Sequence, residues 1–448
     1  MKIGSPALAI KVSHSFSHRQ YLLLAIPLII SGISTPILGA VDTAVVGRLP
    51  DPSAIGGVAI GAFIFNTMYW LFGFLRVSTT GFTSQAQGSH NENETVLTFL
   101  RPMFIAVMVG LIFILLQKPI LHSAIYFIGA SNEITAFSST YFSIRIWGAP
   151  FTLLSYVMIG WLMGLGKVKW TLATQIFMNL LNIVLDILFV PILGLGVAGV
   201  AYATLISEVS AVLFGAWIIV RTNKLTLANF PFGKLLDPAP LIKMLKVNRD
   251  LFLRTVCLLT MTGIFTAKGA SMGEVTLAAN AVLLQIHYLM AYLLGGFANA
   301  SSIIVGRAIG GKDQSLFKRA LSLSAQWGFL AAIVLSLCLV FFGEQVVSLF
   351  TTIHEVKVTA YDLLIWMLIF PFVGFWGLQL EGIFSGATEA RFIRDSILFA
   401  LLIFLLSNWL FIPHLHNNGV WLSFIIFSAG RSFFLWLYVP KLTRVKFG

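Results

Sequence analysis

The sequence predicts an all-α polytopic membrane protein, with twelve transmembrane helices in two six-helix lobes related by an internal repeat about an axis along the membrane normal. Three observations support this fold class. First, 58% of the 448 residues are hydrophobic and only 10% are charged, whereas soluble domains carry about 25% charged residues. Second, apolar segments long enough to cross a bilayer recur along the chain. Third, one half of the chain resembles the other.

Each membrane crossing requires about 20 mostly apolar residues in a helix. The apolar segments lack the two-residue alternation of outer-membrane β-strands. The first segment is predicted to be a membrane helix rather than a signal peptide, because it continues past any short apolar core and contains two prolines. We predict spans over residues 20–47, 55–82, 97–117, 134–164, 168–192, 198–220, 250–268, 276–306, 319–342, 358–386, 395–413 and 418–440.

Basic residues indicate how the chain is oriented in the membrane. Most of the 29 lysines and arginines lie on one side of the twelve-span arrangement, in the tails, in residues 221–254 and around residues 307–319. By the positive-inside rule this side is cytoplasmic, so we expect a multi-pass protein of the inner membrane with both termini in the cytoplasm. The same distribution argues against a nucleic-acid partner. The sequence lacks P-loop, zinc-protease and serine-hydrolase motifs, so we do not expect an enzyme.

The internal repeat has an offset of 222 residues. SQAQGSHN (84–91) resembles VGRAIGGKD (305–313), and the same offset aligns Gly73 with Gly295, Gly160 with Gly382, and Pro191 with Pro413. An even number of spans in each half implies that the two halves share one orientation. We predict an N-terminal lobe (1–220) that holds a cation site, a cytoplasmic linker (221–249) and a C-terminal lobe (250–448). Duplicated halves that frame a cavity favour a transporter over a passive scaffold.

Two spans of the N-terminal lobe carry polar stripes. On the fifth span, Gln175, Asn179, Asn182 and Asp186 recur at helical spacing on one face, and on the first span Ser31, Thr35 and Asp42 do the same. An ionisable side chain at this depth costs at least about 2.5–3.5 kcal/mol, which suggests a function. The repeat aligns Asp42 with Ile264 and Asp186 with Asn408, so only one lobe has both acids. We therefore predict a one-sided cation site there, with structural hydrogen bonding as the alternative.

The residue types allow two coupling ions. Two neighbouring carboxylates oppose each other's ionisation and can bind a proton as a unit. Together with Asn182 they also offer hard oxygen ligands for Na⁺, and the sequence does not choose between the two ions. Pro27 lacks a backbone donor and is predicted to let the first helix bend when Asp42 is loaded, although a static kink is the alternative. Thr35, Gln175 and Asn179 are predicted to face the substrate.

Several other intramembrane charges have no assigned role. Glu208 and Arg431 lie on equivalent spans and are candidates for a charge pair between the halves. Arg76 and Arg145 are expected to pair with intramembrane acids or to reach a polar cavity, and His287 is expected to be a core histidine. The role of Arg307 is open.

Five stretches resemble the DinF branch of the multidrug and toxic compound extrusion (MATE) family. They are VDTAVVG (41–47), FLRVSTTGFTSQAQG (74–88), NLLNIVLD (179–186), AANAVLLQ (278–285) and LEGIFSGATEARFIRDS (380–396). The resemblance implies a cation site at Asp42, Asn182 and Asp186, with the Thr204 hydroxyl associated with it, and a role for Pro27 in helix bending. It departs from the NorM-like branch, because the interiors of the seventh and tenth spans lack acids.

The predicted function is secondary active multidrug export, in which small amphipathic or cationic compounds are exchanged for H⁺ or Na⁺ by alternating access. A flippase for lipid intermediates is the alternative, which the central Arg76 and Arg145 keep open. An enzyme is the least favoured class. We expect small-molecule substrates, a surrounding lipid bilayer, a monomer and no cofactor.

Overall fold

The computed structural model describes residues 16–49, 51–129, 131–223 and 232–448. Over these residues the chain is helical without strands, and 12 segments are long and apolar enough to cross a membrane. The predicted fold class is confirmed. The spanning helices are α1 (His18–Val46), α2 (Pro52–Leu71) continued by α3 (Phe74–Gly88), α4 (Glu92–Leu115), α6 (Asn132–Arg145) continued by α7 (Ala149–Gly164), α8 (Val168–Ile187), α9 (Gly196–Asn223), α10 (Pro238–Ala270), α11 (Glu274–Gly310), α12 (Gln314–Phe350), α14 (Leu364–Gly386), α15 (Ala390–Leu415) and α16 (Asn417–Leu437) continued by α17 (Val439–Phe447).

Two short helices were not predicted: α5 (Gln117–Ile128) and α13 (His354–Asp362). Both are too short to cross a bilayer. On α5, Tyr126 and Phe127 are 77% and 84% exposed, as on an amphipathic helix at the membrane interface. The expected span 358–386 is wrong at its start, because the chain breaks at Leu363 and the spanning helix begins at Leu364. The charged segment HEVKVTAYD is costly in hydrocarbon and forms its own helix.

Two spans of the N-terminal half are interrupted. Between α2 and α3, the backbone N–H groups of Phe72 and Gly73 donate to Tyr69 and Trp70, at 3.1 Å in both cases, which is a tighter turn than α-helix. Two residues after Asp186, the chain passes from α8 into a π-helical turn, Leu188–Ile192, which contains Pro191. Such wide turns often occur at functional sites because they redirect the side chains beside them.

The repeat is visible in the backbone. Three pairs of residues that are 222 positions apart have positive φ. They are His90 and Lys312 (53° and 54°), Gly166 and Thr388 (74° and 54°), and Gly194 and His416 (67° and 49°). Positive φ is uncommon outside glycine. Three such pairs at one separation show that the two halves fold alike, as predicted.

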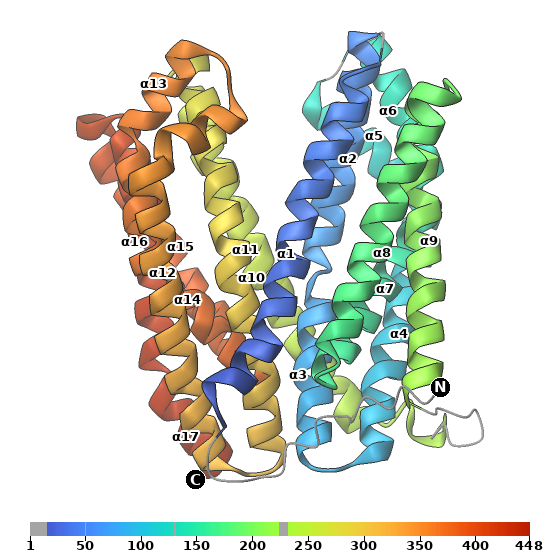
Figure 1. Ribbon diagram of the computed structural model, residues 1–448, viewed down its shortest axis with the longest axis vertical. Helices are drawn as coiled ribbons and strands as arrows, with labels where there is room; N and C mark the ends of the chain where they lie inside the picture. The colour runs from blue at the N-terminus through green and yellow to red at the C-terminus, as the bar shows by residue number, and fades with distance from the viewer. Residues whose placement is uncertain (1–15, 50, 130, 224–231) are drawn as a thin grey trace.

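Close helix crossings repeat in the same way. A Cβ atom on Gly160 would overlap the backbone of Arg76, and one on Gly382 would overlap the backbone of Ala298. Both residues of the second contact lie 222 positions after their counterparts in the first. Between the halves, α3 and α11 cross so that Gly88 meets the backbone of Arg307 while Gly310 meets that of Gln85. This contact is reciprocal, so the pseudo-twofold axis passes through it. The two halves diverge from this end towards the end that carries α13 (Figure 1).

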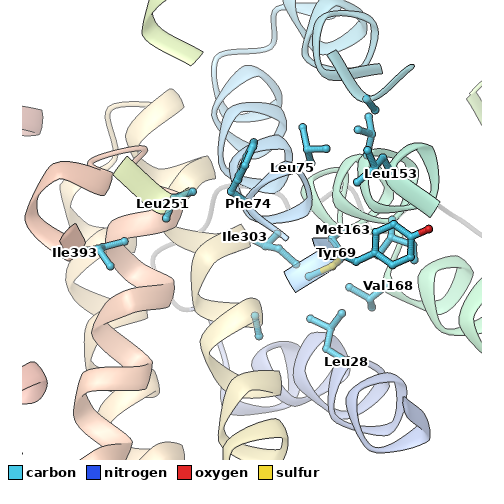
Figure 2. Packing of buried hydrophobic residues seen from close by; sticks show 14 of the residues in the cluster. Leu28, Tyr69, Phe74, Leu75, Leu153, Met163, Val168, Leu251, Ile303 and Ile393 are labelled. Carbon is cyan, nitrogen blue, oxygen red and sulfur yellow. The ribbon is translucent and has the colours of Figure 1, made fainter. Parts of the chain in front are cut away.

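Apolar burial joins the halves as well. One buried cluster contains Leu28 and Phe74 from the N-terminal half together with Leu251 and Ile303 from the C-terminal half (Figure 2). The lobe boundaries at 220 and 250 stay a prediction: α9 runs to Asn223, α10 begins at Pro238, and residues 224–231 of the predicted linker lie outside the described residues.

Candidate functional site

Asp42 and Asp186 meet where α1 packs on α8. Their carboxyl groups lie within hydrogen-bonding reach of each other. Asp186 is fully buried, and both of its oxygens, like Oδ1 of Asp42, have no donor among the described residues. An ionised carboxylate accepts but does not donate. The two groups can therefore bond to each other only when one holds a proton, or can coexist as anions only with a cation between them.

The polar stripe of α8 continues from this pair and attaches α8 to α1. Asn179 Nδ2 donates to the Ser34 hydroxyl at 3.0 Å and to the Ser34 carbonyl at 3.3 Å. Gln175 Nε2 donates to Asn179 Oδ1 at 3.1 Å. Thr35, the next residue on α1, is exposed. Of the three expected substrate-facing residues, Asn179 therefore bonds to α1, Gln175 bonds to Asn179 within α8, and Thr35 is exposed.

Asn182 and Thr204 are the remaining predicted members of the cation site. Asn182 is one helical turn before Asp186, is buried, and has an unpartnered Nδ2 among the described residues. Thr204 on α9 is half-buried and donates its hydroxyl to the Val200 carbonyl at 3.1 Å, which leaves its oxygen lone pairs available. Carboxylate, amide and hydroxyl oxygens are hard ligands. The orphaned acid oxygens fit Na⁺ as well as H⁺, and the choice between these ions stays open.

Arg145 pairs with a third acid of the N-terminal half. Its Nη2 is 3.6 Å from Oε1 of the buried Glu208 on α9, and its Nη1 donates to the Tyr141 hydroxyl at 2.9 Å. The guanidinium also lies 4.8 Å from the centre of the Phe65 ring, close enough for a cation–π contact. Its charge acts on Asp42 and Asp186 as well. Arg145 therefore pairs with Glu208 and also attracts Asp42 and Asp186 electrostatically.

The charge pair between halves, Glu208 with Arg431, is wrong. Glu208 pairs with Arg145 inside the N-terminal half, as expected for Arg145, while Arg431 pairs with Glu381 at 2.7 Å inside the C-terminal half. A charged group in the membrane takes its partner from the helices packed around it. The sequence signal was the presence of these charges within spans, but it did not specify which of them meet.

The remaining ionisable residues without an assigned role, Arg76, Arg307 and His287, lie in three different environments. Arg76 is exposed on α3, Arg307 donates from α11 to the Leu165 carbonyl at 2.9 Å, and His287 packs between the rings of Phe370 and Phe424. Asn408, which the repeat aligns with Asp186, is buried with both side-chain atoms unpartnered among the described residues. The C-terminal half therefore does not reproduce the acid pair.

The sequence family follows from comparison with known proteins. The family model MatE matches residues 27–188 and 251–410, most of the chain. The chain belongs to this family. It is a MATE transporter, not an enzyme.

Individual relatives agree with this assignment. The MATE chain is 35% identical to DNA damage-inducible protein F of Escherichia coli over 408 residues, 91% of this chain and 89% of that protein. It is 23% identical to multidrug export protein MepA of Staphylococcus aureus over 390 residues, 84% and 85% of the two proteins. The fold matches the outward-facing structure of a multidrug resistance MATE family transporter of the MOP superfamily, with a TM-score of 0.86 at 22% identity, over 95% of this chain and 96% of the other.

Proposed function

We propose that this MATE protein is a secondary active multidrug exporter that antiports small amphipathic or cationic compounds against H⁺ or Na⁺ by alternating access. The observation that carries the proposal is the Asp42–Asp186 pair, two acids in contact inside the membrane with orphaned oxygens. Two like charges at this separation oppose each other's ionisation, so the pair takes up a cation. Its MATE relatives include a multidrug export protein.

The site lies between two helices, and this location couples ion binding to shape. Loading the pair removes the repulsion between Asp42 on α1 and Asp186 on α8, and unloading restores it. Asn179 and Ser34 hold the same two helices together on one side of the site. Pro27 lies within α1 and is half-buried; it lacks an N–H and weakens the helix there. We assign it the bend through which α1 responds to the ion.

The setting follows from the same proposal. The multi-pass chain lies in the inner membrane with both termini in the cytoplasm and works as a monomer on small molecules, without a cofactor or nucleic acid. The end where α1 begins and where α17 lies is then cytoplasmic (Figure 1). The ends that diverge face the outside.

The test is efflux of a fluorescent cationic dye from proteoliposomes, first under an imposed pH gradient and then under a Na⁺ gradient. We expect one of the gradients to drive efflux by the native protein. Asp42→Asn and Asp186→Asn keep the shape of the acids but remove the charge that binds the ion, so both should lose gradient-driven efflux. Asp362→Asn is the matched control, because Asp362 is an exposed acid at the end of α13.

Three results would count against parts of the proposal. Unchanged efflux in Asp42→Asn would show that this acid is structural. A normal rate in Pro27→Ala would remove the bend from the mechanism. If neither gradient drives efflux by the native protein, transport of a lipid intermediate becomes the better interpretation.

A further inference from the structure

Three side chains form an ion cluster inside the C-terminal half, which we call the basic triad: Arg254 on α10, Glu381 on α14 and Arg431 on α16. Glu381 pairs with both arginines, one carboxylate oxygen to each. The side chains of Arg254, Glu381 and Arg431 are 21%, 14% and 17% exposed. They are largely removed from solvent but remain within reach of a ligand.

The charges of the basic triad do not balance. One carboxylate faces two guanidinium groups, and over the described residues neither Arg254 nor Arg431 forms an ion pair with another acid. His287 interacts electrostatically with Arg431 but adds no negative charge. Nε of Arg254 is buried and unpartnered among the described residues. An unbalanced charge within a membrane span is costly, so a counter-charge is expected.

Other acids of the C-terminal half are engaged elsewhere. Asp250 on α10 pairs with Arg394 and Arg249, both at 2.8 Å, and Glu389 pairs with Arg391 and Lys446. Asp362 is exposed at the end of α13. Over the ranges that the structure describes, none of these carboxylates forms an ion pair with the basic triad.

The basic triad has no counterpart in the repeat. The offset of 222 aligns Arg254 with Gly32, Glu381 with Ile159 and Arg431 with Val209. The N-terminal half instead has three intramembrane carboxylates, Glu208, Asp42 and Asp186, and one arginine, Arg145, that pairs with the first of them. The two halves therefore have interiors of opposite polarity. A shared fold does not require this difference, which therefore indicates a function for the basic triad of the C-terminal half.

Helix α10, which carries Arg254, lies at the contact between the halves. Two residues before Arg254, Phe252 packs against Phe72 and Phe74 at the α2–α3 interruption, with ring centres 6.2 Å and 6.5 Å apart. Helix α10 thus contacts the N-terminal half on one face, and through Arg254 it contacts Glu381 of its own half. Residues two apart on an α-helix point about 200° away from each other, so Arg254 and the basic triad lie on the side of α10 that faces its own half.

We propose that Arg254 and Arg431, held in position by Glu381, bind an anionic group of an amphiphile, namely a carboxylate, sulfonate or phosphate ester. Guanidinium groups suit these anions because several N–H donors converge on their oxygens. Resting on the proposed export function, this assignment names a substrate class: amphiphiles that carry an anionic group, including zwitterions.

The test compares two rhodamine dyes that differ in one group. One is the cationic methyl ester, and the other is the same rhodamine with its free carboxylate. Binding is measured by fluorescence polarisation on purified protein. Arg254→Gln and Arg431→Gln should weaken binding of the free-carboxylate dye about tenfold, the effect of losing a charge-assisted hydrogen bond, and change binding of the ester little. Arg249→Gln is the matched control, the same change on an exposed arginine of the same helix.

Glu381→Gln separates the proposal from a purely structural role. Removing the competing carboxylate frees both arginines, so the free-carboxylate dye should bind more tightly and raise the midpoint of thermal unfolding of this variant more than that of the native protein. A structural ion cluster predicts no such gain. Equal effects of the arginine substitutions on both dyes, or no gain in Glu381→Gln, would overturn the proposal.

The anion can belong to exported cargo or to a lipid headgroup, and a competition experiment distinguishes them. Displacement of the free-carboxylate dye by phosphatidylglycerol, but not by zwitterionic phosphatidylcholine, identifies a headgroup; efflux of that dye from proteoliposomes identifies cargo. Failure of the ester dye to be driven by either gradient would count against the export function alone. Loss of discrimination between the dyes would count against the anion site alone.

Discussion

At the scale of single residues, Arg145 is the position on which the charges of the N-terminal half depend. Its side chain is 11% exposed and that of Glu208 is 9% exposed, so neither charge is well solvated. Oε2 of Glu208 has no partner among the described residues and fills the space beside Gly148. Removing the arginine would leave the acid buried and unpaired, which is much more costly than never having had either charge.

We predict that Arg145→Met destabilises the protein strongly, by about 3–5 kcal/mol. In the double variant Arg145→Met/Glu208→Met no charge is left orphaned, so its midpoint of thermal unfolding should recover most of the loss. Differential scanning fluorimetry in detergent measures both. A double variant that is as unstable as the sum of the two single variants would contradict this account, because it would mean that the two side chains do not interact.

At the scale of helices, the periodic patterns predicted most of what was found. Gln175, Asn179 and Asp186 share a helical face by spacing alone, and that face does meet α1. Spacing defines a face but not the helix that packs on it. For that reason the sequence could not specify the partner of Glu208, and the candidate pair with Arg431 is wrong. Short amphipathic helices such as α5 were missed because they lack the long apolar run that marks a span.

The crossing of α3 and α11 could be recognised from the sequence only as a repeat of small residues. The structure shows that Gly310 is pressed against the Gln85 backbone, whereas a methyl group added at Gly295 on the same helix would have no neighbouring atom of the described residues within 4 Å. Glycine is needed at the first position for close approach and not at the second.

We predict opposite effects for the same substitution at these two positions of α11. Gly310→Ala forces the halves apart at their crossing and should lower the unfolding midpoint, since overpacking costs about 1–3 kcal/mol. Gly295→Ala meets no described atom and should keep or raise the midpoint, because alanine favours helix by about 0.5–1 kcal/mol. Thermal unfolding of the two variants side by side measures the difference. Equal midpoints would show that the crossing tolerates separation.

At the scale of the whole molecule, the halves behave as two similar bodies that meet at one end. The reciprocal contact of Gly88 with Arg307 and of Gly310 with Gln85 lies on the pseudo-twofold axis. Two hydrogen-bonded contacts accompany it: Arg307 donates to the Leu165 carbonyl and Gln85 Nε2 donates to the Gly386 carbonyl at 2.8 Å. The donors Gln85 and Arg307 are 222 positions apart, and the acceptors Leu165 and Gly386 lie in equivalent turns, one position out of register with the repeat.

If the halves rock about the α3–α11 crossing, around an axis that lies in the membrane plane, distances at the two ends must change in opposite senses. Spin labels placed at equivalent positions report both ends: Ser131→Cys with Ile353→Cys where the halves diverge, and Glu92→Cys with Gln314→Cys where they meet, all four being exposed. Cys257 and Cys338 are the free cysteines of the described residues and are replaced by serine in the background. Adding the cationic dye and the coupling cation in turn should shorten one distance distribution while lengthening the other, as measured by double electron–electron resonance. Two pairs that change together, or a single pair that changes alone, would show that the halves do not rock as rigid bodies, and the rearrangement would then have to take place within one half, at α1 and its proline.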